Sequence, residues 1–272
     1  MNTLLLNTLC LTLLVLLSST GCTPAPGPLR VAVAANFRNT FDTLAQRYLA
    51  ETSLRVEVAY AATGILYAQI INGAPFDVFL AADRLRPERL ETLGTGVPGS
   101  RVTYAFGQLV LWVPGADHAL GEGWLRSYRG RLAIANPELA PYGVAARAVL
   151  ALINPQLLEQ GLVLGASVTQ ATHYVASGGV PAGLLAFPVL RDRPSNELWR
   201  IPENRYPAIE QQAIAIAGPR QRAARAFIDF LTSDTARREI TAAGYRVPER
   251  VPERVPARVP ERVSERERMS GL

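Results

Sequence analysis

Residues 61–83, with the sequence AATGILYAQIINGAPFDVFLAAD, decide the fold. Thr63 and Gly64 directly precede apolar residues that recur at helical spacing, and the tetrapeptide NGAP at 72–75 ends that helix and turns the chain. Residues 76–80 then form a short apolar run that predicts a buried strand. A helix that begins at Thr-Gly presents backbone N–H groups, a hydroxyl donor and a positive dipole end, and together these features favour an anion.

The same alternation of strand and helix runs along most of the chain. Residues 29–35 (LRVAVAA) are continuously apolar, as in a parallel strand that is covered on both faces. The alternation therefore predicts parallel α/β sheets, and the roughly 220 residues between the ends suffice for two lobes. The predicted strands are 29–35, 54–60, 76–80, 108–113, 131–135, 162–166, 183–187 and 212–217, and the predicted helices are 37–49, 65–71, 87–93, 143–153, 169–176, 221–231 and 235–243.

The N-terminal end predicts export. Residues 1–21 contain an apolar run that is too short to span a bilayer and is followed by small polar residues, which is typical of a secretory signal peptide. Residues 18–22 (SSTGC) resemble a bacterial lipobox, in which Cys22 becomes the lipid-modified first residue, although position 19 is Ser where Leu is usual. Residues 22–28 would then be a lipid anchor and an extended tether. Ordinary cleavage without lipidation, which gives a soluble secreted protein, is the alternative.

Composition excludes several kinds of site. Cys10 lies in the segment that is removed, so a mature chain with Cys22 alone has no internal disulfide and no thiol nucleophile. All 28 basic residues are Arg, which excludes a phosphate-loop lysine and a Schiff-base lysine. His118 and His173 lack the spacing of a metal site. The Val-Pro-Glu-Arg repeat at 248–272 predicts a disordered tail, and its interleaved Glu residues disfavour binding to nucleic acid.

Four predicted turns share one form, in which a strand ends, a small or polar residue follows and a helix begins. In open α/β sheets, ligands bind outside the carboxyl ends of the strands, where such turns gather. With two turns in each lobe, four helix N-termini would surround an anion with N–H donors. None has Arg at its tip, and neutral donors favour a fully deprotonated tetrahedral dianion. The turns are Ala35-Asn36, Thr63-Gly64, Tyr142-Gly143 and Val168-Thr169.

Five stretches with intact spacing resemble the molybdate-binding (ModA-type) solute receptors of bacterial ABC importers. They are VAVAANF (31–37), the opening stretch (61–83), GSRVTYAFGQLVLWV (99–113), LAIANPELAPYG (132–143) and GASVTQATHYVASG (165–178). The resemblance implies a class II periplasmic-binding-protein fold, with two α/β lobes joined by two crossover strands. We expect lobe 1 to comprise 29–107 plus 206–247, and lobe 2 to comprise 108–205. Such a receptor captures molybdate or tungstate between its lobes and delivers it to a membrane permease and its ATPase.

The resemblance also implies which residues bind the ion. Ala35 and Asn36 match the first oxyanion-binding turn, and Thr63 matches a Ser or Thr hydroxyl donor. Tyr142 matches an Ala-Pro-Tyr-Gly turn, and Val168 matches a turn that donates a backbone N–H. The metal arrives as its oxyanion, so no direct protein ligand to metal and no cofactor are expected. Thr63 carries a methyl group that Ser lacks, which bears on ion preference.

Structural roles such as capping and packing are the alternative to ion binding for several of these residues. Helix capping is the usual role of Asn36 and Thr63 at such positions, Tyr142 is a candidate packing aromatic, and Asp83 is expected to be a structural cap. A receptor for another oxyanion such as sulfate is the main functional alternative. An enzyme is disfavoured because the sequence has no nucleophile–base pair, and a lipoprotein that only senses the ion stays open. We expect a monomer in the periplasm or at the outer face of the cell membrane, anchored through Cys22.

Overall fold

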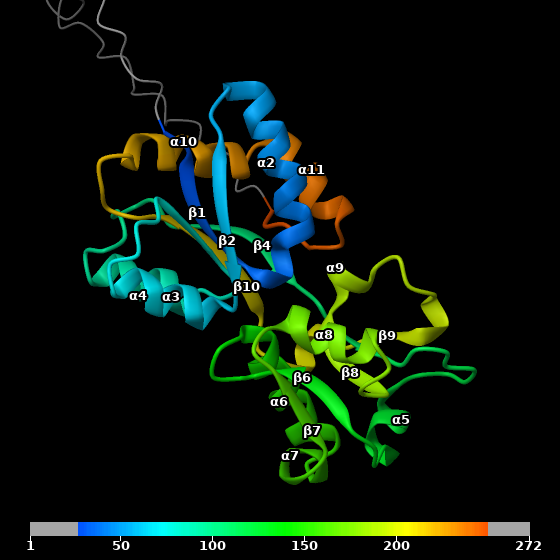
Figure 1. The fold of residues 1–272 in the computed structure, drawn as a ribbon. Helices are drawn as coiled ribbons and strands as arrows, with labels where there is room; N and C mark the ends of the chain where they lie inside the picture. Colours follow the sequence, from blue (N-terminus) through cyan, green and yellow to red (C-terminus); the bar gives the residue numbers. More distant parts are fainter. Residues whose placement is uncertain (1–26, 250–272) are drawn as a thin grey trace, which may run out of the picture.

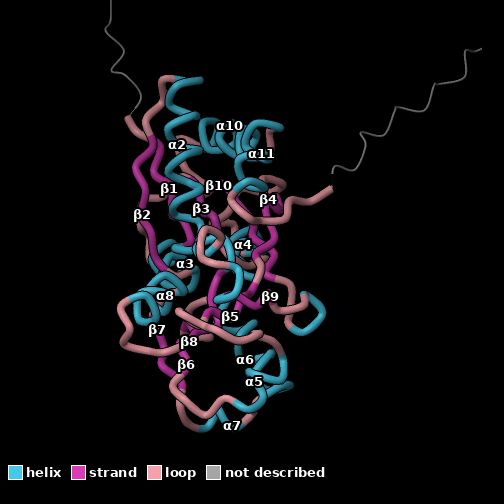
Figure 2. The backbone as a smooth tube through the Cα atoms, turned by 90° about the vertical axis from the view of Figure 1, so that its right-hand side faces the viewer, coloured by secondary structure: helices cyan, strands magenta, loops and turns pink. Residues whose placement is uncertain are grey.

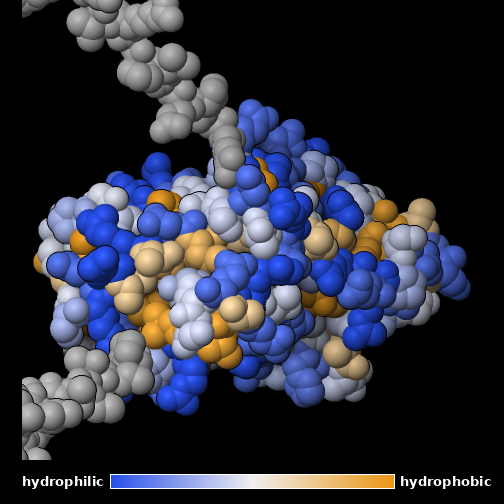
Figure 3. All heavy atoms as spheres, turned by 90° about the horizontal axis from the view of Figure 1, so that it is seen from above, coloured by the Kyte–Doolittle hydropathy of each residue, from blue (hydrophilic) through white to orange (hydrophobic). Residues whose placement is uncertain are grey.

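The computed structural model describes residues 27–249 as two α/β lobes, one above the other in Figure 1. The predicted signal peptide, the proposed lipidation site at Cys22 and nearly all of the predicted tail lie outside these residues. Within them, no helix has the length and apolar character needed to cross a membrane. Seen from above, hydrophilic residues cover most of the surface, and hydrophobic residues gather in groups between them (Figure 3).

Lobe 1 is built on a sheet with the strand order β2-β1-β3-β10-β4. The first three strands are parallel, and β10 runs antiparallel to both of its neighbours. Its strands are β1 (Leu29–Ala34), β2 (Val56–Ala61), β3 (Val78–Ala81), β4 (Val102–Gly107) and β10 (Ile209–Ala215). Its helices are α2 (Arg38–Thr52), α3 (Thr63–Ile71), α4 (Leu85–Thr92), α10 (Gln221–Leu231) and α11 (Asp234–Ala242), with the 3-10 turn η1 (Ala35–Phe37) after β1.

The period of two along the strands divides the core of lobe 1 between the two faces of the sheet. Val31 and Val33 pack in the cluster that contains residues of α2, α10 and α11. Ala32, between them in β1, packs in a second cluster with Leu66 of α3 and Leu90 of α4. Figure 1 shows these two helix layers on opposite sides of the sheet. The apolar run at the start of the chain is therefore covered on both faces, as predicted.

Lobe 2 is built on a sheet with the strand order β7-β6-β8-β5-β9. The strands β6, β7 and β8 are parallel, and β5 is antiparallel to β8 and β9. Its strands are β5 (Leu109–Trp112), β6 (Leu132–Ala135), β7 (Leu162–Gly165), β8 (Ala182–Ala186) and β9 (Leu198–Arg200). Its helices are α5 (Glu122–Ser127), α6 (Pro141–Ile153), α7 (Gln156–Glu159), α8 (Val168–Ala176) and α9 (Phe187–Leu190).

The chain crosses between the lobes twice. Strand β4 ends at Gly107 in the first sheet and β5 begins at Leu109 in the second, so Gln108 alone separates them. The return passes through the 3-10 turn η3 (Glu203–Arg205) to β10. Figure 2 shows β4 and β10 in the upper lobe and β5 and β9 in the lower one. The predicted architecture of two α/β lobes with two crossovers is confirmed, and the exact lobe limits stay a prediction.

Five of the strands and α-helices have no counterpart among the predicted ones: β4, β9, α5, α7 and α9. The sequence of β4, VTYAFG, is rich in residues that favour strands, but the prediction places a strand only in the adjoining apolar run at 108–113. The three-residue β9 lies in a polar stretch broken by prolines and pairs only with β5. For the three-residue β9, pairing with β5 makes the segment a strand.

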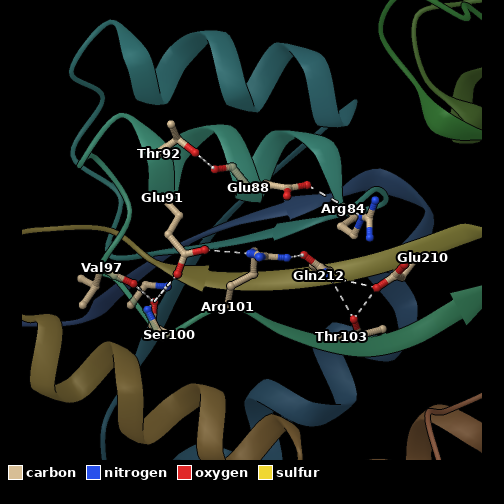
Figure 4. Close-up of polar contacts among 12 residues, drawn as sticks. Arg84, Glu88, Glu91, Thr92, Val97, Ser100, Arg101, Thr103, Glu210 and Gln212 are labelled. Carbon is tan, nitrogen blue, oxygen red and sulfur yellow. Dashed lines mark hydrogen bonds and ion pairs between the residues drawn. The ribbon is translucent and has the colours of Figure 1, made fainter.

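A polar cluster fixes the strand β10 against α4 (Figure 4). Glu91 of α4 accepts from Arg101 Nε at 2.9 Å, and Arg101 Nη1 donates to Gln212 Oε1 at 3.0 Å. Gln212 Nε2 then donates to Thr103 Oγ1 at 2.9 Å. The pairing of β10 with β4 shifts register between Gln211 and Gln212, as at a β-bulge. Gln212 therefore has its partners on the α4 side of the sheet, whereas Gln211 bonds to Asn36 and Tyr104.

Candidate functional site

The structure brings the five predicted site residues together around one small cavity between the lobes. Ala35, Asn36 and Thr63 contribute from lobe 1, and Tyr142 and Val168 contribute from lobe 2. The remaining lining residues are Ala34, Ala62, Ala82, Ala140, Pro141 and Ser167. The free volume is about 10 Å³, close to the smallest space that holds one water molecule. A cavity of this size excludes a sugar or a peptide.

Four helical segments begin at residues that line the cavity. These are η1 at Ala35, α3 at Thr63, α6 at Pro141 and α8 at Val168. The first N–H groups of a helix lack partners within the helix, and the dipole makes this end positive. Pro141 has no N–H, but at the first position of a helix none is needed. The four strand–helix turns thus meet at one place, with α6 beginning two residues before the predicted start.

The hydroxyl of Thr63 is held as a donor. Its oxygen accepts a hydrogen bond from the Ala82 N–H at 3.0 Å, and the side chain is almost fully buried. The hydroxyl hydrogen is therefore free to point into the cavity. Helix α3 has Ala62 as its N-cap and no side-chain cap, so the capping alternative for Thr63 is wrong.

One of the backbone groups predicted to be free at this turn has a partner. The Gly64 N–H donates to the Leu139 carbonyl oxygen of lobe 2 at 2.8 Å. The start of α3 therefore serves two purposes, since Thr63 lines the cavity while Gly64 holds the lobes together. The sequence gives no sign of this division because the partner lies in the other lobe.

Asn36 is buried and connected to residues far along the chain. Its Nδ2 donates to Gln211 Oε1 at 2.9 Å and to the Tyr245 hydroxyl at 3.2 Å. The Tyr245 hydroxyl in turn donates to the Asn36 carbonyl oxygen at 2.8 Å. No side chain caps η1 or α2, so capping is wrong for Asn36 as well. Two glutamines at the start of the apolar stretch 211–217 (QQAIAIA) are the sequence feature that points to Gln211, and none points to Tyr245.

Tyr142 has a buried hydroxyl without a hydrogen-bond partner among residues 27–249. The side chain is 1% exposed, and its hydroxyl lies against Gly107, where a Cβ would collide with it. Burial raises the pKa of Tyr142 well above its ordinary value, and the nearby hydroxyls of Tyr245, Tyr206 and Tyr104 raise it further. The group is therefore a protonated donor at neutral pH. A buried donor without an acceptor requires an explanation, and a bound anion supplies one.

Charged side chains are absent from the cavity lining in the described part of the chain. The nearest carboxylate in sequence is Asp83, directly after Ala82. Its Oδ1 accepts from the Arg86 N–H at 2.9 Å near the start of α4, and its other oxygen pairs with the Arg86 guanidinium. Asp83 therefore bonds to an N–H in the first turn of α4, although Arg84 is the N-cap of that helix. The positive charge of Arg86 offsets its negative charge.

A family model described as bacterial extracellular solute-binding protein matches residues 29–246. The molybdate-binding protein ModA of Azotobacter vinelandii is 40% identical over 231 residues, which cover 82% of this chain and 92% of that protein. The ModA protein of Rhodobacter capsulatus is 37% identical over 224 residues, which cover 81% and 89%. The chain belongs to the bacterial extracellular solute-binding proteins, in the group of the ModA proteins.

Solved structures support the assignment of this chain to the solute-binding proteins. The periplasmic molybdate-binding protein of Azotobacter vinelandii superposes with a TM-score of 0.75 and 35% identity, covering 81% of this chain and all of that one. The sulfate-binding protein SubI of Mycobacterium tuberculosis H37Rv superposes with a TM-score of 0.66, covering 82% and 88%. At 14% identity, the second match shows a shared fold only.

In the described part of this solute-binding protein, the hydrogen bonds between the lobes include three that lie beside the cavity. Besides the Gly64–Leu139 bond, Arg86 Nη2 donates to the Glu138 carbonyl oxygen at 3.1 Å. Thr169 Oγ1 donates to the Ala35 carbonyl oxygen at 3.1 Å. Each bond has its donor in one lobe and its acceptor in the other, so rotation of the lobes breaks all three.

The remaining candidate residues lie away from the cavity. His118 bonds to Asp117 and stacks on Trp124, and His173 is on α8 outside the lining. All three tryptophans are in lobe 2, and none lines the cavity, so calorimetry is a more direct measure of binding than tryptophan fluorescence. In the described part of the chain, no group of three or more His, Cys, Asp or Glu residues is placed to hold a metal ion.

Proposed function

We propose that this solute-binding protein captures molybdate or tungstate between its lobes and delivers it to an ABC permease and its ATPase. The observation that carries the proposal is the buried Tyr142 hydroxyl, a donor without an acceptor at a cavity lined by neutral groups. Ala35, Asn36, Thr63, Tyr142 and Val168 are the proposed binding residues. The identity of the relatives in the ModA group supports molybdate as the ligand.

The mechanism is binding without chemistry. A dianion loses its water shell on entering the cavity, and hydrogen bonds from neutral donors replace that shell. Hydrogen bonds to a charged acceptor are stronger than those between neutral groups, and the helix dipoles add to them. Closure of the lobes then forms one continuous surface for the permease to recognise. The proposal includes no catalytic residue and no cofactor.

Two features determine which anion binds: the hydrogen-bond donors and the size of the cavity. Donors without a facing acceptor disfavour hydrogen phosphate, which keeps a proton at neutral pH and needs an acceptor for it. Sulfate, like molybdate, only accepts hydrogen bonds, so charge cannot separate the two and size must. The small cavity and the Thr63 methyl group favour the smaller ion, and a sulfate receptor is therefore the second candidate.

We further propose that the protein acts outside the cytoplasm as a monomer. The proposed signal peptide at 1–21 and the proposed lipidation of Cys22 would hold it in the periplasm or at the outer face of the cell membrane. A receptor that only senses the ion would have the same site, and loss of molybdate uptake after deletion of the gene distinguishes transport from sensing.

Isothermal titration calorimetry with molybdate, tungstate, sulfate and phosphate tests the proposal. We expect molybdate and tungstate to bind most tightly, sulfate more weakly, and phosphate not measurably at neutral pH. The variant Tyr142→Phe tests the site itself, because it removes only the unpartnered hydroxyl. Tighter binding of sulfate than of molybdate would contradict the substrate assignment and favour the second candidate.

A further inference from the structure

The side chain of Tyr142 reaches from lobe 2 to the strands that join the lobes. Tyr142 belongs to the first turn of α6 and lines the cavity. Its hydroxyl lies against Gly107, the last residue of β4 before the crossover at Gln108. Gly107 is paired with Ile209, the first residue of β10 after the return crossover. The hydroxyl therefore lies where both connections between the lobes meet the sheet of lobe 1.

Gly107 makes room for this hydroxyl because it has no side chain. A Cβ at position 107 would lie 2.3 Å from the Tyr142 hydroxyl oxygen and 2.9 Å from Cζ of the same ring. Gly107 is buried and does not have a positive φ, so space and not backbone conformation is what glycine supplies here. Since non-bonded heavy atoms approach to roughly 3.5 Å, the ring would have to move by about 1 Å to admit that Cβ.

The main chain that carries Tyr142 is not free to retreat from such a collision. Gly143 follows directly, and a Cβ there would lie 2.2 Å from the Ala135 carbonyl oxygen and 2.8 Å from the Pro137 nitrogen. The first turn of α6 is therefore packed backbone against backbone on the end of β6. The Tyr142 side chain has to absorb the displacement through its own torsions.

The free space beside the ring decides the direction of the movement. Tyr142 is 1% exposed, and the side chains of a protein core are close-packed. Tyr142 lines the cavity, whereas Gly107 does not. Among residues 27–249, no hydrogen bond fixes the Tyr142 hydroxyl, so packing sets its position. A side chain at position 107 therefore pushes the ring toward the cavity.

We infer that Gly107 is a positioning residue that sets how far the Tyr142 hydroxyl reaches toward the bound ion, and that it thereby sets ion preference from outside the cavity lining. The inference rests on the proposed function and deepens it. With glycine at position 107, the hydroxyl is held back and leaves room for the larger ion, molybdate. A side chain at this position advances the hydroxyl and shifts the preference toward sulfate.

Gly107→Ala tests this role with the smallest side chain. In the full chain, we expect calorimetry to show that molybdate affinity falls at least tenfold, with sulfate affinity measured by competition against molybdate. The affinity ratio of molybdate to sulfate should fall at least threefold, because the larger ion loses more from a smaller cavity. General damage to the site would lower both affinities equally. Equal losses, or an unchanged molybdate affinity, would overturn the inference.

A double-mutant cycle with Tyr142→Phe shows whether the effect passes through the tyrosine. Phenylalanine lacks the oxygen that lies closest to the added Cβ, so it relieves most of the collision. Without ligand, Tyr142→Phe should raise the melting temperature more in Gly107→Ala than in the wild type. In the Tyr142→Phe background, Gly107→Ala should weaken molybdate binding less than threefold further. Additive effects in either measurement would overturn the inference.

The same rescue applies if Gly107→Ala alone does not fold. A cooperative melt of the double variant Gly107→Ala/Tyr142→Phe is then the expected result, because the collision is relieved. Its absence would show that the damage at position 107 does not come from Tyr142 and would overturn the inference.

Gly96→Ala is the matched control for a crowded glycine in lobe 1. A Cβ at position 96 would lie 2.4 Å from Cδ1 of Ile214 in β10, and Gly96 is outside the cavity lining. This substitution should lower the melting temperature while both affinities stay within threefold of the wild type. A change of ion preference as large as that in Gly107→Ala would attribute the effect to strain in the lobe and overturn the role of Gly107.

Binding by the wild type separates this inference from the proposed function. A wild type that binds molybdate, together with equal losses for both ions in Gly107→Ala, would overturn the role of Gly107 alone. A wild type that binds no tetrahedral oxyanion would overturn the proposed function and, with it, the selection of ions by size.

Discussion

Replacing Gly64 with Ala should weaken ligand binding while leaving the unliganded protein as stable as before. A Cβ at this position would lie 3.0 Å from Arg86 Nη2, 3.1 Å from the Leu139 carbonyl oxygen and 3.2 Å from Leu139 Cα. Arg86 is a flexible side chain and can move aside. Leu139 contributes backbone atoms from the other lobe, so lobe 2 must retreat by a few tenths of an ångström. The closed arrangement is therefore destabilised and the open one is not.

The size of the effect follows from the contact that is disturbed. Retreat of lobe 2 lengthens the hydrogen bond of 2.8 Å from the residue 64 N–H to Leu139 and spoils the packing around it. A net loss of about 1–2 kcal/mol is expected for a hydrogen bond and its surroundings. Since 1.4 kcal/mol is a factor of ten, molybdate affinity should fall ~5- to 30-fold. Alanine is the better helix former by up to about 1 kcal/mol, so the melting temperature without ligand should stay equal or rise.

Calorimetry with molybdate and thermal melting without ligand measure these two quantities separately. The matched control is Gly123→Ala, because Gly123 is likewise the second residue of its helix, α5, and a Cβ there meets nothing within 4 Å. This control should leave affinity unchanged. Small-angle scattering should show compaction on binding that is reduced in Gly64→Ala. Wild-type affinity and full compaction in Gly64→Ala would refute the role assigned to the lobe contact.

Three further predictions concern the cavity and the polar cluster. Tyr142→Phe should weaken molybdate binding ~10- to 100-fold in calorimetry. The unliganded protein should keep or gain stability, because an unpartnered buried hydroxyl is removed. A loss of both affinity and stability would indicate that Tyr142 only packs in the core. Thr63→Ser should raise the affinity ratio of molybdate to sulfate, because it enlarges the cavity and keeps the donor; an unchanged ratio would contradict selection by size. Arg101 and the Gly99 N–H hold the pKa of Glu91 below its ordinary value of 4.5, so the Glu91–Arg101 contact stabilises the folded protein above that pH and loses this effect as the pH falls further. Acid melts should therefore show a smaller drop in stability for Glu91→Gln than for the wild type, and parallel curves would contradict the contact.

Local sequence predicted the turns and the strands that lie in continuous apolar runs. The segments around Ala35, Thr63, Tyr142 and Val168 each contain their own strand end, small residue and helix start, so they can be recognised without knowledge of the rest of the molecule. Their meeting at one cavity follows from the general position of ligands at the carboxyl ends of strands. The structure agrees on both points.

Contacts between distant segments could not be predicted in the same way. Asn36 lies 175 residues from Gln211 and 209 from Tyr245, and nothing near Asn36 in the sequence specifies either partner. The Gly64–Leu139 bond depends on how the lobes close, which is a property of the whole molecule. Strand β4 was missed although Val102, Thr103 and Tyr104 favour a strand, because the prediction places the strand in the more continuous apolar run at 108–113. In the structure both runs are strands, β4 in the sheet of lobe 1 and β5 in the sheet of lobe 2.

Ala35 and Val168 have no polar side-chain atom, so anything they give to an anion comes from the main chain. Every residue except proline carries the same peptide N–H. Exchange of either side chain for another small apolar one would therefore leave that donor in place. Over evolutionary time such positions can drift while the protein keeps its ligand. What must persist is the point at which each strand stops and each helix begins, so distant relatives with the same ligand are better found by comparing backbone paths than by matching residue types at these two positions.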